Sequence, residues 1–194
     1  MDPAAPPFVC NIAAYRLSPR FRETHIAHRP THRRTWDGWG ADDLRAIDAA
    51  IPGFRPPFSL QDGRFSDLHF MILRRDADHF HYPNPVIVLS DEACFSATDG
   101  FLAAFATLPN VTLMGAPSRG GSGSARRRSL RNSGITIRLS TMASFQPCGT
   151  PFEGVGVDVD VVSRPPSSDF INGRDTVLER ATQMLRTRSA ASGD

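Results

Sequence analysis

The sequence predicts an α/β fold, and three neighbouring segments carry that prediction. Pro85–Ser90 (PVIVLS) is a continuous apolar run, which is typical of a buried strand in a parallel sheet that is covered on both faces. Val111–Met114 (VTLM) is a second apolar strand. Between them, Ala97–Leu108 predicts an amphipathic helix, whose apolar face consists of Phe101, Leu102, Phe105 and Leu108. A strand, a helix and a strand in this order form a βαβ unit with a right-handed crossover.

The segment before this unit is harder to assign to regular structure. Residues 1–67 look irregular, because prolines, arginines and scattered aromatic residues interrupt any regular pattern. One short helix is expected over Ala41–Ile51, where Leu44 and Ile47 recur at helical spacing and Pro52–Gly53 ends the pattern. A strand is expected at Leu68–Leu73.

The C-terminal part alternates short strands with loops and ends in a helix. Residues 115–134 predict a Gly/Ser/Arg-rich loop, and Arg164–Ser168 predicts a turn. Further strands are expected at Ile135–Leu139, Met142–Phe145 and Val155–Val162, and an amphipathic helix at Asp175–Arg188. The predicted organisation is therefore an irregular segment over 1–67 that is inserted in or wraps the core, a core over 68–188, and a disordered tail over 189–194.

Composition excludes several classes of mechanism. All 22 basic residues are arginine, so a Schiff-base lysine, a Ser-Lys dyad and a phosphate-loop lysine are excluded within this chain. The net charge of +2 is too small for a polycation, so nucleic-acid binding is not expected from overall charge. The sequence contains no apolar run of 18 residues, so no membrane span is predicted, and the N-terminus lacks the pattern of a signal peptide. These observations leave the compartment open.

Ser96 is the strongest candidate for a reactive residue. It lies between the strand Pro85–Ser90 and the following helix, where open α/β sheets place their ligands. Free N–H groups at the start of a helix can stabilise a developing oxyanion. The alternative is that Ser96 only caps the helix with its hydroxyl.

Four motifs in order resemble the tail-specific, or C-terminal processing, serine peptidases, including their tricorn-like branch. They are Ser96-Ala97-Thr98-Asp99, Val111–Gly121, the stretch Glu153-Gly154-Val155-Gly156-Val157, and Asp169–Ala181. The resemblance covers roughly residues 68–187. It implies a crotonase/ClpP-like fold of layered sheets with flanking helices, of which this chain holds an incomplete core, the C-terminal half.

The same resemblance assigns roles to individual residues. It implies that Ser96 is the nucleophile, that the N–H of Ala97 lies in the oxyanion hole, and that Gly120 and Gly121 contact substrate. Glu153 matches a glutamate that supports a histidine base, and this histidine is expected outside the chain. The lysine base of the processing branch would fall near Gly121, where this sequence has none. Asp99 and Asp158 depart from the family pattern, which has glutamate and proline there.

The implied function is a serine-type peptidase that acts on peptides or proteins through an acyl-enzyme at Ser96. The alternative is a catalytically inactive peptide-binding module of the same fold. No cofactor and no metal are expected, and a homo-oligomer is possible.

Three weaker candidates remain. His25, His28 and His32 with Glu23 have spacing that could bind a metal, although a solvated loop is the simpler interpretation. His79 and His81 are potential local bases. The run Arg126–Arg128 could bind phosphate, but no aromatic residue interleaves it, and nucleic acid is not expected as a partner.

Overall fold

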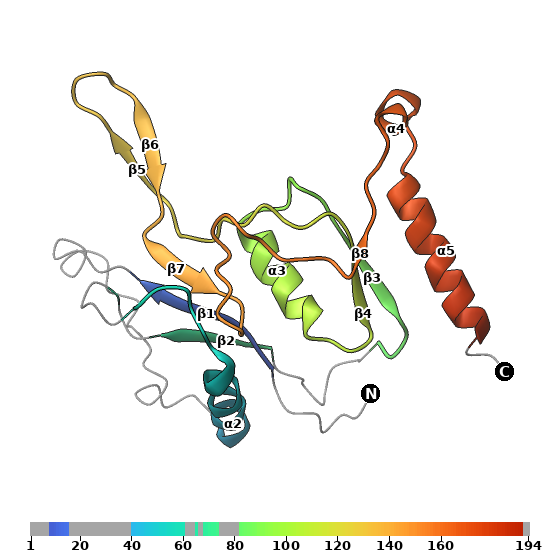
Figure 1. Cartoon of the computed structure of the whole chain (residues 1–194), viewed down its shortest axis with the longest axis horizontal. Coiled ribbons are helices and arrows are strands. Elements are labelled where there is room, and N and C mark those ends of the chain that lie inside the picture. Colours follow the sequence, from blue (N-terminus) through green and yellow to red (C-terminus); the bar gives the residue numbers. More distant parts are fainter. Residues whose placement is uncertain (1–7, 16–39, 61–64, 66–67, 74–81, 192–194) are drawn as a thin grey trace.

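A computed structural model describes residues 8–15, 40–60, 65, 68–73 and 82–191 of the chain. The described strands form three small sheets, which helices accompany (Figure 1). One sheet is parallel and two are antiparallel. The predicted α/β class is confirmed.

The parallel sheet contains the predicted βαβ unit. Strands β3 (Val86–Ser90) and β4 (Val111–Gly115) are parallel neighbours, and α3 (Ala97–Ala106) connects them. β8 (Val161–Val162) extends the sheet on the other side of β4. The buried cluster joins α3 and β4 to the segment between β7 (Met142–Phe145) and β8, and it consists of Leu102, Ala103, Leu113, Phe152 and Val157. β3 lies at one edge of this sheet. Leu89 on this strand is 38% exposed, so the prediction that both faces are covered was wrong at this residue.

The first antiparallel sheet has order β2–β1–β7. Its central strand β1 (Phe8–Tyr15) pairs with β2 (His69–Leu73) and with β7 (Met142–Phe145). Helix α2 (Ala41–Ala50) continues into a 3-10 turn at Ile51–Gly53 and packs Ile47 against Val9 and Ile12. Segments distant in sequence therefore share one core.

Four sequence-based predictions need correction here. The irregular segment 1–67 contains β1, which sequence analysis missed because a bulge between Val9 and Asn11 breaks its alternation. The loop predicted over 115–134 contains β5 (Arg126–Ser129), which pairs with β6 (Thr136–Leu139), so the arginine run lies on a strand. Of the strand predicted over Val155–Val162, only β8 forms, because Gly156 has a positive φ of 79° and interrupts the rest. Part of the predicted turn at Arg164–Ser168 begins helix α4 (Ser167–Asn172).

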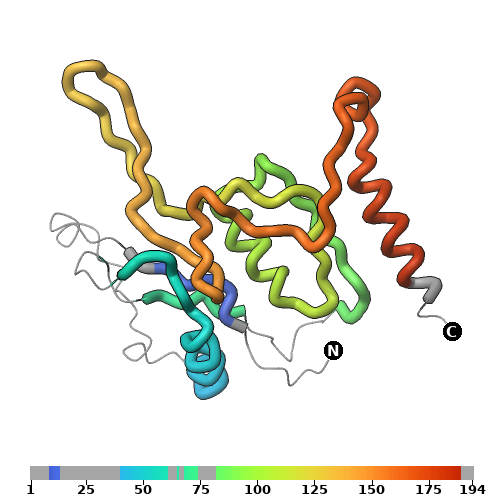
Figure 2. Tube along the Cα trace, in the orientation of Figure 1, coloured from blue at the N-terminus to red at the C-terminus, as the bar shows by residue number. Residues whose placement is uncertain are grey.

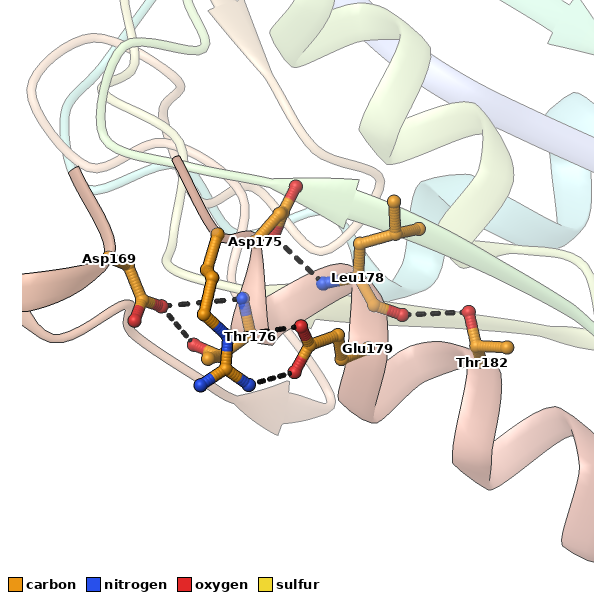
Figure 3. Close-up of polar contacts among 7 residues, drawn as sticks. Asp169, Asp175, Thr176, Leu178, Glu179 and Thr182 are labelled. Atoms are coloured by element: carbon orange, nitrogen blue, oxygen red, sulfur yellow. Dashed lines mark hydrogen bonds and ion pairs between the residues drawn. The ribbon is translucent and has the colours of Figure 1, made fainter. Parts of the chain in front are cut away.

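Helix α5 (Thr176–Ala191) continues three residues into the segment that was expected to be a disordered tail, and the last three residues lie outside the described part. Its start is fixed by polar contacts from the preceding turn (Figure 3). The buried carboxylate of Asp169 accepts hydrogen bonds from the N–H and the hydroxyl of Thr176, and Asp175 Oδ1 accepts from the N–H of Leu178 at 2.9 Å. Arg174 pairs with Glu179 at 2.7 Å. α5 lies against β3 and β4.

None of the described helices combines the length and the apolar character that crossing a membrane requires.

The packing of α2 can be tested by truncating its buried side chain. Ile47 is fully buried, so Ile47→Ala is expected to lower the free energy of unfolding by about 2–5 kcal/mol. Leu44→Ala on the same helix is the control, because Leu44 is 38% exposed and its loss should cost about 1 kcal/mol or less. Urea unfolding measures both. Equal destabilisation would contradict the packing of α2 on β1.

Candidate active site

Ser96 occupies an unusual backbone position at the start of α3. Its φ of 62° and ψ of −113° are rarely adopted by a residue with a side chain, and Ser124 is the one other non-glycine residue with positive φ in the described part of the chain. The side chain of Ser96 makes no capping hydrogen bond to α3. The residue is exposed. The geometry therefore does not fit the alternative that Ser96 serves as a helix cap.

A tight turn holds Ser96 in this position. The carboxylate of Asp91, just after β3, accepts hydrogen bonds from the N–H groups of Ala93 and Cys94 at 2.8 and 3.0 Å. The N–H groups of Thr98 and Asp99 donate to the carbonyls of Phe95 and Ser96. The N–H of Ala97 has no acceptor among the described residues, so it is the free donor beside the Ser96 hydroxyl.

Asp99 ties α3 to the loop that follows β4. Its carboxylate is fully buried and accepts three hydrogen bonds. They come from Ser118 Oγ at 2.6 Å, from Gly120 N at 3.2 Å and from Gly121 N at 3.0 Å. Ser118 Oγ in turn accepts the N–H of Val157 at 2.8 Å. A buried carboxylate needs such donors, so this network fixes the loop beside Ser96.

The glycines of this loop permit close approach of two chain segments. Gly120 has φ of 71°, and an added Cβ would lie 1.9 Å from the carbonyl oxygen of Phe152. The N–H groups of Gly120 and Gly121, which sequence analysis assigned to substrate binding, donate to Asp99. Any contact of these two residues with substrate would therefore use other atoms.

Glu153 has one carboxylate oxygen engaged and one without a partner. Oε1 accepts from Gly123 N at 2.9 Å and from Ser140 Oγ at 2.7 Å. Oε2 is buried and has no hydrogen-bond partner among the described residues. An unpaired buried carboxylate oxygen is costly, so this atom is placed to accept a further donor.

A cavity of about 390 Å³ lies beside Ser96. Two strands of the antiparallel sheet and one side of α3 form it, and its lining residues are Asn11, Met71, Ser96, Ala97, Gly100, Phe101, Ala104 and Ser122. Most of these side chains are apolar or small. The hydroxyl of Ser122 is hydrogen-bonded to that of buried Ser144. An apolar side chain of a ligand would fit this cavity.

Sequence analysis missed most of the cavity lining. It placed Phe101 on the core face of its helix, but Phe101 is 49% exposed and lines the cavity. Asn11 and Met71 belong to β1 and β2, whose approach to α3 depends on long-range pairing. Gly100 was the one available signal, because a glycine inside a helix often marks close approach or open space. An added Cβ there would meet no atom within 4 Å.

Several predicted groups cannot be placed. Glu23, His25, His28, His32, His79 and His81 all lie outside the described residues. The metal and local-base hypotheses that rest on them stay predictions. Cys94, in the turn before Ser96, is half-buried and packs against the core cluster of α3.

Comparison with known proteins supplies the family. The model of peptidase family S41 matches residues 44–163, which is more than half of the chain. No curated protein gives a significant match.

Three solved structures are among those similar to this chain. A putative peptidase from Parabacteroides merdae is 32% identical, covers 63% of this chain and 38% of its own, and superposes with a TM-score of 0.54. Mature CPAF complexed with lactacystin is 16% identical, covers 95% of this chain and 39% of its own, and has a TM-score of 0.60. The tricorn protease is 21% identical over 72% of this chain and 13% of its own, with a TM-score of 0.38.

The chain thus spans about two fifths of the length of the first two structures. The mixed parallel and antiparallel sheets agree with the layered fold that the resemblance implied. The match to the family model over more than half of the chain shows that the chain belongs to peptidase family S41.

Proposed function

We propose that this chain carries the nucleophile of a serine peptidase and that Ser96 attacks the carbonyl carbon of a peptide bond. The observation that carries the proposal is the Ser96 backbone, which is held at positive φ while the hydroxyl is exposed and caps nothing. Conformational strain of this kind persists where the surroundings impose it, as at reactive residues.

The proposed reaction has two stages. A base takes the Ser96 hydroxyl proton as Oγ bonds to the carbonyl carbon. The carbon–nitrogen bond then breaks, and the leaving amine receives that proton. Water hydrolyses the resulting ester and restores the serine. The base is expected to be a histidine from outside this chain, as the resemblance implies.

The free N–H of Ala97 is proposed as one oxyanion donor. It is the N–H in the first turn of α3 without an acceptor among the described residues, and it adjoins Ser96. A preorganised backbone donor stabilises the negative charge that develops on the carbonyl oxygen.

Glu153 is proposed to orient the base through its unpaired Oε2. Its other oxygen holds Gly123, the neighbour of the cavity-lining residue Ser122. Glu153 is therefore tied to the wall of the cavity while Oε2 accepts a proton donor of the relay.

Peptides or proteins are the proposed substrates, and the cavity beside Ser96 would take an apolar side chain next to the scissile bond. Gly120 and Gly121 stay predicted substrate contacts, and self-association also stays a prediction.

Replacing Ser96 tests the nucleophile. Ser96→Ala in the protein as it occurs in the cell should abolish labelling by a fluorophosphonate and lower peptide hydrolysis by a factor on the order of 10³ or more. Ser124→Ala is the control, since Ser124 is the other serine at positive φ and is exposed. If folded wild-type protein resists the label, or if Ser96→Ala leaves turnover unchanged, the inactive peptide-binding module becomes the better interpretation.

Substitution at Gly100 tests the cavity. Gly100→Phe should fill it and lower kcat/KM at least about tenfold for peptides with a large apolar residue before the scissile bond. Gly100→Ala is the matched control, because its Cβ meets open space and alanine favours the helix by about 1 kcal/mol. Steady-state kinetics on peptides that differ at this one position give the readout. Equal losses in the two variants would remove the cavity from substrate recognition.

Replacing Asp99 tests the buried network as a positioning device. Asp99→Asn places an amide nitrogen opposite one of the two glycine N–H groups, because Gly120 and Gly121 donate to different oxygens of the carboxylate, so it should lower the free energy of unfolding by about 2–4 kcal/mol. Below the unfolding transition, it should also reduce kcat more than it raises KM. Asp158→Asn is the control, because Asp158 is exposed and has no partner among the described residues. An unchanged kcat in folded Asp99→Asn would show that the network stabilises the fold without positioning the site.

A further inference from the structure

The hairpin of β5 and β6 extends away from the rest of the chain (Figures 1 and 2). The two strands pair with each other and with no third strand in the described part of the chain. Both outer edges of the hairpin therefore present backbone N–H and C=O groups that a further strand could pair with. A two-stranded hairpin is marginally stable in water, so added contacts would stabilise it.

This hairpin concentrates positive charge. No aspartate or glutamate occurs between Asp99 and Glu153, whereas six arginines do, in a chain whose net charge is only +2. Four of these arginines are exposed on the hairpin and have no ion pair with any described residue: Arg127, Arg128, Arg131 and Arg138. No carboxylate among the described residues therefore neutralises the charge of these four arginines.

The strand register adds an unfavourable contact that an anion would relieve. Arg127 lies directly opposite Arg138, and like charges at directly opposed positions destabilise a hairpin. Carboxylates beside this pair would replace repulsion by attraction. Within a strand that lies along the hairpin, alternate side chains would share the face of these two arginines.

Apolar side chains distinguish the hairpin from a phosphate-binding surface. Leu130, Ile135 and Leu139 are 46%, 58% and 55% exposed, and residues 122–144 contain no aromatic residue on which a base could stack. A polypeptide that carries both carboxylates and aliphatic side chains matches this mixture better than a nucleic acid does.

The base of the hairpin is joined to the candidate active site. Glu153 Oε1 accepts from Gly123 N on one side of the hairpin and from Ser140 Oγ on the other. The N–H groups of Thr141 and Met142 both donate to the carbonyl of Gly123. Ser122, the residue before Gly123, lines the cavity beside Ser96. A polypeptide segment that binds the hairpin would therefore lie on an element whose base adjoins the wall of the cavity.

We propose that the hairpin of β5 and β6 is a docking arm for an extended acidic polypeptide segment with interspersed aliphatic residues, which adds as a strand to one of its free edges. Carboxylates of that segment pair with Arg127 and Arg138, which share one face of the hairpin, and its aliphatic side chains contact the exposed apolar residues of the arm. This inference goes beyond the proposed catalytic role of Ser96, because such binding needs no hydrolysis.

Binding of a defined peptide tests the docking arm. The probe is a fluorescein-labelled peptide of alternating glutamate and valine, and its anisotropy is measured with the whole chain at low and physiological salt. R127E/R138E should weaken binding at least about tenfold. R180E/R186E is the matched control, because it changes net charge equally at exposed positions of α5 and should retain binding. Circular dichroism checks that both variants keep the wild-type fold.

Two further probes separate the alternatives. The same peptide is also prepared with N-methyl groups on alternate residues, once for each of its two edges. The version that is methylated on the edge facing the hairpin should bind more weakly, because it cannot donate backbone hydrogen bonds to the hairpin. A glutamine-valine peptide should not bind. Equal weakening in both double variants, tighter binding of an oligothymidylate than of the acidic peptide, or no effect of N-methylation on either edge would each overturn the proposal. Since none of these readouts involves cleavage, they are independent of whether Ser96 is a nucleophile.

Discussion

The buried carboxylate of Asp99 is the interaction on which the candidate site depends. It lies in the first turn of α3 and binds three donors from the loop after β4. Through Ser118 the same network reaches Val157 near the C-terminal end of the core. A charge that is removed from water requires these donors, and no apolar side chain could take its place without leaving them unpaired. One side chain thus connects three segments that are distant in sequence.

This connection allows backbone strain to persist at Ser96. The turn after β3 is held by Asp91, and the loop opposite it is held by Asp99. Between these two fixed points, Ser96 keeps a positive φ without a capping hydrogen bond. Its hydroxyl is therefore available, and the N–H of Ala97 beside it has no acceptor among the described residues. Strain, exposure and a free donor come from the same local arrangement.

Glu153 joins the site to the hairpin of β5 and β6. One oxygen closes the base of the hairpin, and the other is buried without a partner among the described residues. The proposed catalytic relay and the proposed docking arm thus meet at one carboxylate. The charge of the arm and the apolar character of the cavity suit different parts of one polypeptide, because the arm favours acidic residues and the cavity favours an aliphatic or aromatic one.

By itself, the sequence determined the βαβ unit, the two helices α2 and α5, and the position of Ser96 between a strand and a helix. These features depend on local periodicity and on the order of neighbouring segments, which a single sequence displays. The tertiary structure decided the central place of β1, the strand that carries Arg126–Ser129, and the cavity formed with Asn11 and Met71. The reason is physical: β1 and β5 have weak or interrupted alternation, so their strand state comes from partners far along the chain. Likewise, the N–H groups of Gly120 and Gly121 face Asp99 only because long-range packing brings that carboxylate to them.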